Sequence, residues 1–338
     1  MTTVDLDIPD VVREVGAPGE TGRRRRSRSS PRSSRKPWFR QSLAGLALVL
    51  PALVILGIFT YVPALLVLAI SFFHWNLAGF GKSHFAGLAQ YKALVNPYSG
   101  FLGSLTVTAY YVGVMVPATL GIGLGLAWLL RGSLKRRTRG LGFFRAVVFL
   151  PYVTPAVATS VVWVFVFNPQ FGLANALLRA VGLPALGWLS SSTWALPAVM
   201  IDNLWKQAGF AVVLFLAGLS RIPQDVMEAA ELDRASPARV FRQIVLPYLS
   251  PVTLVVVILT TIGAMQTFGS IYTLTGGQFG GGGGPVNSTT TTAIYLYKSA
   301  FIDFHYGYGA AVAVVMFVLM VVLALFQRKL GERHTFYR

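Results

Sequence analysis

The stretch RIPQDVMEAAELDRASPARVFRQIVLP, residues 221–247, is a polar segment between two long apolar runs. It carries four acidic and four basic side chains. Pro223 is typical of a first helical turn, and the pattern predicts a helix over 224–232 followed by a turn at 233–235. Ser236 before Pro237 predicts a second helix start, because the serine hydroxyl can cap the first turn and proline presets its φ. The stretch is therefore expected to form a helix–turn–helix outside any membrane.

Apolar runs recur along the rest of the chain. Of 338 residues, 54% are hydrophobic and only 12% are charged, whereas a soluble domain carries about a quarter of its residues as charged side chains. Runs near the roughly 20 residues that a bilayer requires lie at about 43–72, 102–130, 144–167, 194–219, 248–272 and 308–326. The sequence predicts an all-α, polytopic membrane protein with six transmembrane helices. Pro51 and Pro63 predict a tilt or kink in the first.

The net charge of +17 is concentrated in particular loops. One basic cluster lies between Arg23 and Lys36, and a second, between two apolar runs, extends from Arg131 to Arg145. Basic residues in alternate loops are the signature of cytoplasmic segments, so both termini are expected in the cytoplasm. The folded basic module that nucleic-acid binding requires is missing from the pattern.

These features predict three parts. Residues 1–40 form a disordered basic cytoplasmic tail whose basic end contacts anionic membrane lipid. Residues 41–330 form the six-helix transmembrane domain, in which 220–247 is a cytoplasmic loop. Residues 331–338 form a cytoplasmic C-terminus.

The sequence offers little for catalysis. It has no cysteine, no Ser-His-Asp set or converging carboxylate pair, and no P-loop. The glycine run at 280–284 lacks the lysine and helix that cradle phosphate. We therefore expect no catalytic residue, no metal site and no cofactor in this chain.

The polar segment carries a recognisable spacing. Glu228-Ala229-Ala230, then Ile244 and Leu246-Pro247, resemble the hallmark of the permease subunits of binding-protein-dependent ABC importers. Arg234 stands where that hallmark has glycine. Further pieces resemble sugar permeases of the maltose-uptake type: Leu150-Pro151-Tyr152, Phe167-Asn168-Pro169, Trp205-Lys206, Leu274-Thr275-Gly276-Gly277 and Tyr306-Gly307. The resemblance covers residues 43–329.

This resemblance implies the type I ABC importer permease fold in a bacterial cytoplasmic membrane. It implies ATP-driven import of a carbohydrate, or of a glycerol-phosphate-type substrate, which the same pattern allows. The implied partners are a second permease, a dimer of ATP-binding cassette subunits that binds ATP and Mg, and an extracytoplasmic solute-binding protein. The loop around Glu228 would seat in a cleft of the ATPase.

Comparison with the maltose-type site implies a substrate pathway. Its residues would be Tyr152, Asn203, Gln207, Gln266, Thr267 and Ser270. Asn203 and Gln207 are four residues apart and so share a helix face. The alternative is that these polar groups only join helices to one another, as such groups often do in membrane bundles.

Two further questions stay open at the level of sequence. Asp202 and Lys206 could form an intrahelical pair, which a proton-coupled secondary transporter would use. Such a carrier needs no ATPase loop, and a structural or signalling membrane protein explains neither the loop nor the amides.

If the turn at Arg234 requires a positive φ, arginine costs about 1 kcal/mol relative to glycine. Either the turn differs here, or the guanidinium has an acceptor on the ATPase.

Overall fold

The computed structural model describes residues 38–75, 83–135, 141–276 and 283–332, and the chain divides into two units at Leu56. The first unit contains α1 (Trp38–Leu56), a helix that includes Pro51. Trp38–Arg40, which the sequence analysis assigned to the tail, are therefore helical. The rest of the predicted tail and residues 333–338 lie outside the described residues.

The described residues of the second unit form helices, connecting loops and one small hairpin, in which β1 (Phe73–His74) pairs antiparallel with β2 (His84–Phe85). Its N-terminal part contains η1 (Gly57–Tyr61), α2 (Val62–Ile70), α3 (Ala89–Val95), η3 (Pro97–Ser99), α4 (Phe101–Lys135), α5 (Leu141–Val153), α6 (Ala156–Val166) and α7 (Leu173–Ala180). Its C-terminal part contains α8 (Ala195–Leu219), α9 (Gln224–Leu232), α10 (Pro237–Val240), η4 (Phe241–Val245), α11 (Leu246–Met265), α12 (Gly269–Ile271), η5 (Tyr272–Gly276), η6 (Pro285–Asn287), α13 (Thr292–Tyr297), η7 (Lys298–Ile302) and α14 (Tyr306–Glu332).

The all-α membrane architecture is confirmed. Five helical stretches of the described chain are long and apolar enough to cross a membrane, and a bent pair of helices makes a sixth if it is counted as one span. The five are Leu48–Ile70, Phe101–Arg131, Ala195–Leu219, Pro237–Met265 and Tyr306–Glu332.

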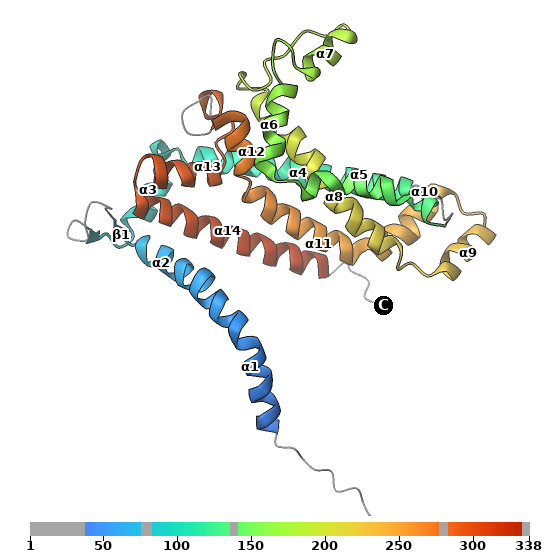
Figure 1. The fold of residues 1–338 in the computed structure, drawn as a ribbon, viewed down its shortest axis with the longest axis horizontal. Coiled ribbons are helices and arrows are strands. Elements are labelled where there is room, and N and C mark those ends of the chain that lie inside the picture. The colour runs from blue at the N-terminus through green and yellow to red at the C-terminus, as the bar shows by residue number, and fades with distance from the viewer. Residues whose placement is uncertain (1–37, 76–82, 136–140, 277–282, 333–338) are drawn as a thin grey trace, which may run out of the picture. The chain divides into compact units, whose positions relative to one another are not determined.

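The third predicted span, 144–167, is not one straight helix. It consists of α5 and α6, whose axes are bent by 105°. Pro155 lies at the break with φ −56° and ψ 131°. Proline has no N–H to continue the hydrogen-bond ladder of α5, and its ring disfavours helical backbone at the preceding residue. Figure 1 shows α6 leaving the direction of α5.

The fifth predicted span, 248–272, is also too long. α11 ends at Met265, and the non-helical residues Gln266–Phe268 separate it from the single turn of α12. At its other end α11 continues from α10 through the π turn η4, in which the Leu246 N–H bonds to the Phe241 carbonyl. The π turn comes directly before Pro247, and such widened turns accommodate disruptions of the α ladder.

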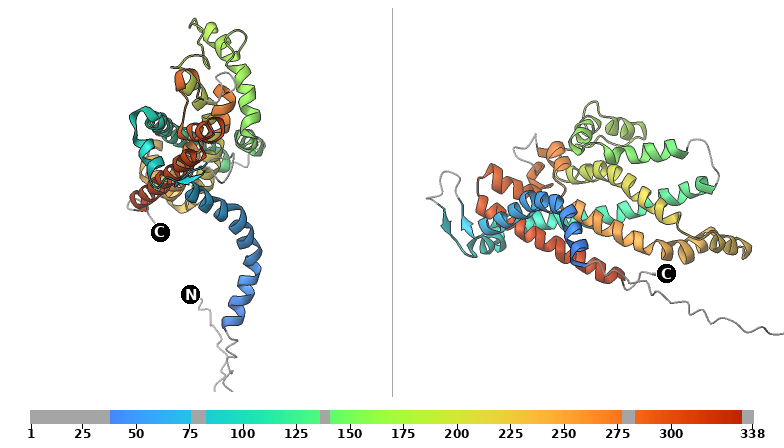
Figure 2. Two further views of the ribbon diagram at one scale, coloured as in Figure 1. Left: turned by 90° about the vertical axis from the view of Figure 1, so that its left-hand side faces the viewer. Right: turned by 60° about the horizontal axis from the view of Figure 1, so that its bottom comes forward.

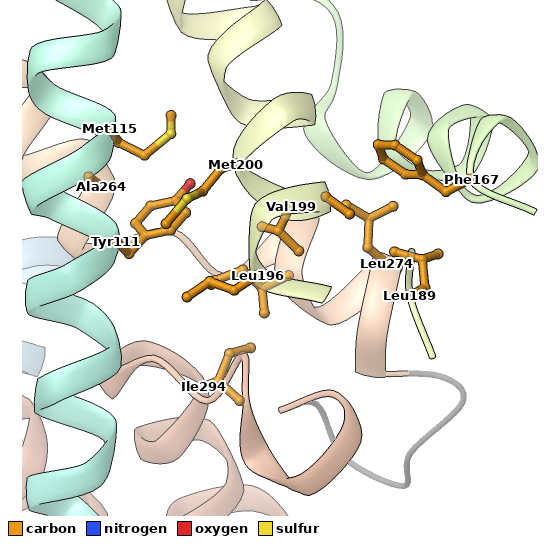
Figure 3. Close-up of a cluster of buried hydrophobic side chains, with 12 residues drawn as sticks. Tyr111, Met115, Phe167, Leu189, Leu196, Val199, Met200, Ala264, Leu274 and Ile294 are labelled. Atoms are coloured by element: carbon orange, nitrogen blue, oxygen red, sulfur yellow. The ribbon is translucent and has the colours of Figure 1, made fainter. Parts of the chain in front are cut away.

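Helix α8 is the centre of the bundle. It packs against α4, α5 and α11, while α11 also packs against α14 (Figures 1 and 2). Small residues allow this close approach in lipid: a Cβ on Gly209 would collide with the Val148 carbonyl of α5, and one on Gly123 with Ala211. Figure 3 shows the apolar cluster beside α8, in which Tyr111 and Met115 of α4 lie near Met200.

Candidate functional site

A cavity of about 430 Å³ lies where the two broken helices meet α8. The α5–α6 bend forms one wall and the break after α11 forms another, so both interruptions of the helical backbone border this space. Helix breaks at membrane depth occur where the backbone lines a cavity or is buried in protein. The lining residues are Tyr152, Thr154, Ala156, Asn203, Lys206, Gln207, Gln266, Thr267, Phe268, Gly269 and Ser270.

All six residues of the predicted pathway belong to this lining. They come from three separate segments, namely α5, α8 and the region from the end of α11 to α12. Sequence reasoning did not include Thr154, Lys206 and Phe268, although the proline after Thr154 marked the bend. Bringing the six together does not by itself assign them a role, because their individual hydrogen bonds differ.

Asn203 and Ser270 bond to one another. The Ser270 hydroxyl donates to the Asn203 side-chain oxygen at 2.9 Å, and the Asn203 amide nitrogen donates to the Val199 carbonyl at 3.0 Å. Both side chains are buried. This pair therefore joins α8 to α12, which is the helix-joining alternative that the sequence left open.

Gln207 and Gln266 are arranged differently. Neither side chain makes a hydrogen bond to another described residue, and Gln266 is exposed to the cavity. A Cβ on Gly263 would lie 3.5 Å from the Gln207 Nε2, so the glutamine amide extends across α11 at a position without a side chain. Two amides thus retain their donors and acceptors for a ligand.

Aromatic faces complete the lining. Tyr152 stacks on Phe210 with ring centroids 4.9 Å apart and also lies 5.6 Å from Phe149. The Thr267 hydroxyl bonds to the Gly263 carbonyl in the last turn of α11. Rings with polar edges beside free amides suit a ligand that has both hydroxyl groups and C–H surfaces.

The expected intrahelical pair of Asp202 and Lys206 is not formed. The Lys206 ammonium instead donates to the Thr154 carbonyl and to the Thr159 hydroxyl, each at 3.0 Å. The Ser160 hydroxyl donates to Asp202 at 2.7 Å. Both charged residues are buried and contact the α5–α6 bend. Lys206 bonds to both sides of the bend, whereas Asp202, one turn away on α8, bonds only to α6.

The polar segment after α8 folds as predicted. α9 spans Gln224–Leu232, and the Ser236 hydroxyl accepts a hydrogen bond from the Arg239 N–H at the start of α10. Between them Arg234 has φ +49°, so the turn is left-handed and the alternative of a different turn is wrong. The Arg234 N–H bonds to the Glu231 carbonyl and the Ala235 N–H to the Ala230 carbonyl, which is a Schellman ending.

A hollow of about 400 Å³ lies on this segment and includes three of the predicted residues, Ala229, Ala230 and Ile244. Glu228 is exposed and accepts a hydrogen bond from Gln224 at 2.6 Å. Leu246 and Pro247 lie in the first turn of α11, away from the hollow. The structure therefore divides the predicted set between the hollow, the exposed face of α9 and the base of α11.

The segment is attached to the end of α4. Trp128 and Phe241 pack edge to face at 5.1 Å, and the Arg131 guanidinium lies 3.9 Å over the Trp128 ring. Arg131, Glu231 and Met227 line one small cavity at this junction. These contacts fix α9 and α10 relative to the bundle.

Comparison with known proteins agrees with this geometry. The family model described as "Binding-protein-dependent transport system inner membrane component" matches residues 118–335. The chain belongs to this family. It is similar to the trehalose/maltose transport system permease protein MalF of Thermococcus litoralis, to which it is 33% identical over 87% of this chain and 95% of that protein. The sn-glycerol-3-phosphate transport system permease protein UgpA of Agrobacterium fabrum is 34% identical over 86% of this chain and 95% of its own.

A solved structure supports the fold of this inner-membrane component. A chain of a bacterial ABC transporter involved in the import of the acidic polysaccharide alginate superposes with a TM-score of 0.75 at 21% identity. The match covers 88% of this chain and 98% of that chain. The type I importer permease fold implied by the sequence is therefore confirmed, and the protein is a multi-pass membrane permease.

Proposed function

We propose that this permease carries a neutral carbohydrate through the cavity beside α8, driven by ATP that partner subunits hydrolyse. The observation that carries the proposal is the pair of unbonded amides, Gln207 and Gln266, facing the same cavity as the Tyr152 ring. Sugars are held by planar hydrogen-bonding groups and by aromatic faces. The relative named as a trehalose/maltose transport system permease supports the same substrate class.

The charge of the cavity favours a neutral substrate over a phosphorylated one. A glycerol phosphate would require a cation with free donors, as in other phosphate sites. Lys206 is the only basic residue in the described lining, and two of its three donors already bond to Thr154 and Thr159. The buried Asp202 lies one turn away and opposes an anion. UgpA is thus a relative in fold, and its substrate is not the one we propose here.

We further propose that the end of the bundle bearing α9 faces the cytoplasm. Arg131, Arg328 and Lys329 lie in the last turns of α4 and α14, and the positive-inside rule places such residues in the cytoplasm. In this orientation the hollow beside Ala229 and the exposed Glu228 receive an ATP-binding cassette subunit that holds ATP and Mg. A second permease and an extracytoplasmic binding protein complete the importer.

The test is uptake by proteoliposomes that contain the complete complex and its binding protein. With ATP enclosed, a radiolabelled neutral saccharide such as trehalose or maltose should accumulate, and a protonophore should not reduce its accumulation. Accumulation that follows an imposed proton gradient without ATP would overturn the proposal in favour of a secondary carrier. Uptake of glycerol 3-phosphate in place of every neutral saccharide tested would overturn the substrate class.

A further inference from the structure

A second, larger cavity lies at the end of the bundle opposite α9, where the β1–β2 hairpin and α3 meet the start of α14 (Figure 1). Its volume is about 680 Å³, which is within the range of roughly 300–1,000 Å³ typical of ligand pockets. It shares no lining residue with the cavity beside α8. Its lining residues are His74, Trp75, His84, Gln90, Asp303, Phe304, His305, Gly307 and Tyr308.

One wall is organised by the buried amide of Gln90, which is only 6% exposed. Its Nε2 lies 3.0 Å from the His74 Nδ1 and donates to the Phe73 carbonyl at 3.4 Å. Because an amide nitrogen only donates, His74 accepts at Nδ1 and carries its proton on Nε2. That Nε2–H is not used in a hydrogen bond to another described residue, so His74 can donate to a ligand. Gly307 keeps the wall closed, since a Cβ there would collide with the Phe73 carbonyl.

Tyr308 supplies the hydrogen-bond acceptor of this cavity. Its hydroxyl lies 3.0 Å from the Tyr295 hydroxyl, and Tyr295 donates to the Ser99 carbonyl. Burial raises the pKa of the Tyr295 phenol, so that this group keeps its proton. The Tyr295 hydroxyl donates its single proton to the Ser99 carbonyl, so it accepts a hydrogen bond from the Tyr308 hydroxyl. The Tyr308 oxygen is left as an acceptor, so the cavity has a fixed donor in His74 and a fixed acceptor in Tyr308.

Phe304 occupies a strained backbone position at the rim. Its φ is +57°, and its side chain is 65% exposed. It directly follows Asp303, the residue that caps the end of η7. The adjacent His305 N–H bonds to the Ser299 carbonyl, which holds this geometry. Glycine adopts such a φ without strain, whereas phenylalanine, like Arg234 at the end of α9, adopts it at a cost. Strained residues of this kind gather at ligand clamps.

The chemistry of the lining selects one class of ligand. Trp75, Phe304 and Tyr308 offer rings, while His74 and Tyr308 offer a fixed donor and acceptor. The lining contains no lysine or arginine to balance an anion. Across the described part of the chain, no three His, Cys, Asp or Glu residues are arranged to hold a metal ion. Its one carboxylate, Asp303, can accept hydrogen bonds from hydroxyl groups and opposes an anion. Rings combined with these hydrogen-bonding groups match a polyhydroxylated ligand without negative charge.

We infer that this cavity is a second saccharide site, separate from the transport cavity and formed by Phe304, His74 and Tyr308. The inference rests on the proposed function for its substrate class. In the proposed orientation the site opens on the outer side, where it would raise the local concentration of saccharide beside the permease.

The test is direct binding to the complete importer complex in nanodiscs, without the binding protein. The probes are trehalose, maltose and glycerol 3-phosphate. Their binding is measured by saturation-transfer NMR and by calorimetric titration. A neutral disaccharide should bind the unmodified complex, and glycerol 3-phosphate should not. In the Gln207→Leu/Gln266→Leu background, which weakens binding at the cavity beside α8, Phe304→Gly should weaken the remaining disaccharide binding at least tenfold. The melting temperature should be unchanged or raised, because glycine relieves the positive φ.

Val286→Gly is the matched control, because Val286 is also exposed, at 90%, and has φ +54°, but does not line this cavity. It should relieve the same strain and leave binding unchanged. Tyr98→Ala removes another exposed ring outside the cavity and should also bind normally.

Two results would overturn the inference. One is unchanged disaccharide binding in Phe304→Gly, and if that variant also no longer captures the binding protein, this surface is a protein-docking site. The other is an equal loss of binding in Val286→Gly. ATP-driven uptake is measured in parallel with the same saccharides. Normal uptake without binding at this cavity rejects only the second site, whereas absence of any saccharide uptake rejects the proposed function.

Discussion

The Lys206 ammonium of α8 donates to the carbonyl of Thr154, the residue directly before the proline at which α5 and α6 bend by 105°. A carbonyl released by a helix break would otherwise be left without its helical donor. The ammonium satisfies it and also bonds to Thr159 on the far side of the bend. Lys206 is thus a positioning residue for one wall of the cavity.

Replacing Lys206 by Met should therefore loosen the bend. Leaving a buried carbonyl unsatisfied costs about 1–3 kcal/mol, so the variant should melt lower and transport more slowly. The chain has no cysteine, which allows spin labels at Val147→Cys and Val162→Cys on the two arms. Electron-spin distance measurements should give a broader distribution in Lys206→Met than in the parent. Lys92→Met, an exposed lysine on α3, is the control, and an equally narrow distribution in both would contradict the role.

The two free amides should act on substrate affinity. Gln207→Leu and Gln266→Leu each remove hydrogen bonds worth about 1 kcal/mol, which corresponds to roughly a fivefold rise in the substrate concentration for half-maximal uptake. Assembly and melting temperature should stay normal. Unchanged uptake kinetics in the double variant would remove both residues from the pathway.

Asn203 provides the contrast within the same cavity. Because its amide bonds to Ser270 and Val199, Asn203→Leu should strand a buried hydroxyl and destabilise the protein by about 1–3 kcal/mol. Thermal unfolding of the purified complex measures this loss. A stable Asn203→Leu variant with weakened substrate affinity would instead place Asn203 among the substrate contacts.

Charge reversal at Glu228 should uncouple the importer. Glu228 is exposed on α9 outside the proposed membrane region, so Glu228→Lys should insert and assemble normally but lose ATP-driven uptake. Membrane fractionation and uptake are measured together. Glu228→Gln should be milder, and Glu332→Lys, a reversal at the end of α14, should have little effect. Normal ATP-driven uptake in Glu228→Lys would show that this side chain does not serve coupling.

Arg234 separates backbone strain from side-chain function. Arg234→Gly should raise stability by about 1 kcal/mol, because glycine adopts a positive φ without strain. Arg234→Ala keeps the strain and removes the guanidinium. If the guanidinium binds the ATPase, both variants should bind the ATPase subunit less tightly, and only the glycine variant should melt higher. Normal ATPase affinity in both would leave the arginine without a docking role.

The sequence predicted the polar segment 221–247 closely and the spans less so. The bounds of α9, the cap at Ser236 and the turn around Arg234 depend on local signals, and the structure reproduces them. The break at Gln266 and the bend at Pro155 interrupt runs whose apolar composition continues, so hydropathy does not reveal them. The distinction between Asn203 and Gln207 depends on tertiary partners, since an amide that joins helices and an amide that faces a cavity have the same sequence pattern.

The continuous helical path from Pro237 to Met265, which includes the π turn η4, has a mechanical consequence. Its 29 residues, at about 1.5 Å per residue, form a rod of about 43 Å. One end directly follows the turn after α9, and the other end is the break that borders Gln266. If the proposed ATP-binding cassette subunit at α9 turned this end of the helix by about 5°, the cavity end would move by about 4 Å over that length. Substrate release could then follow from the swing of a single stiff element, without any signal relayed from side chain to side chain.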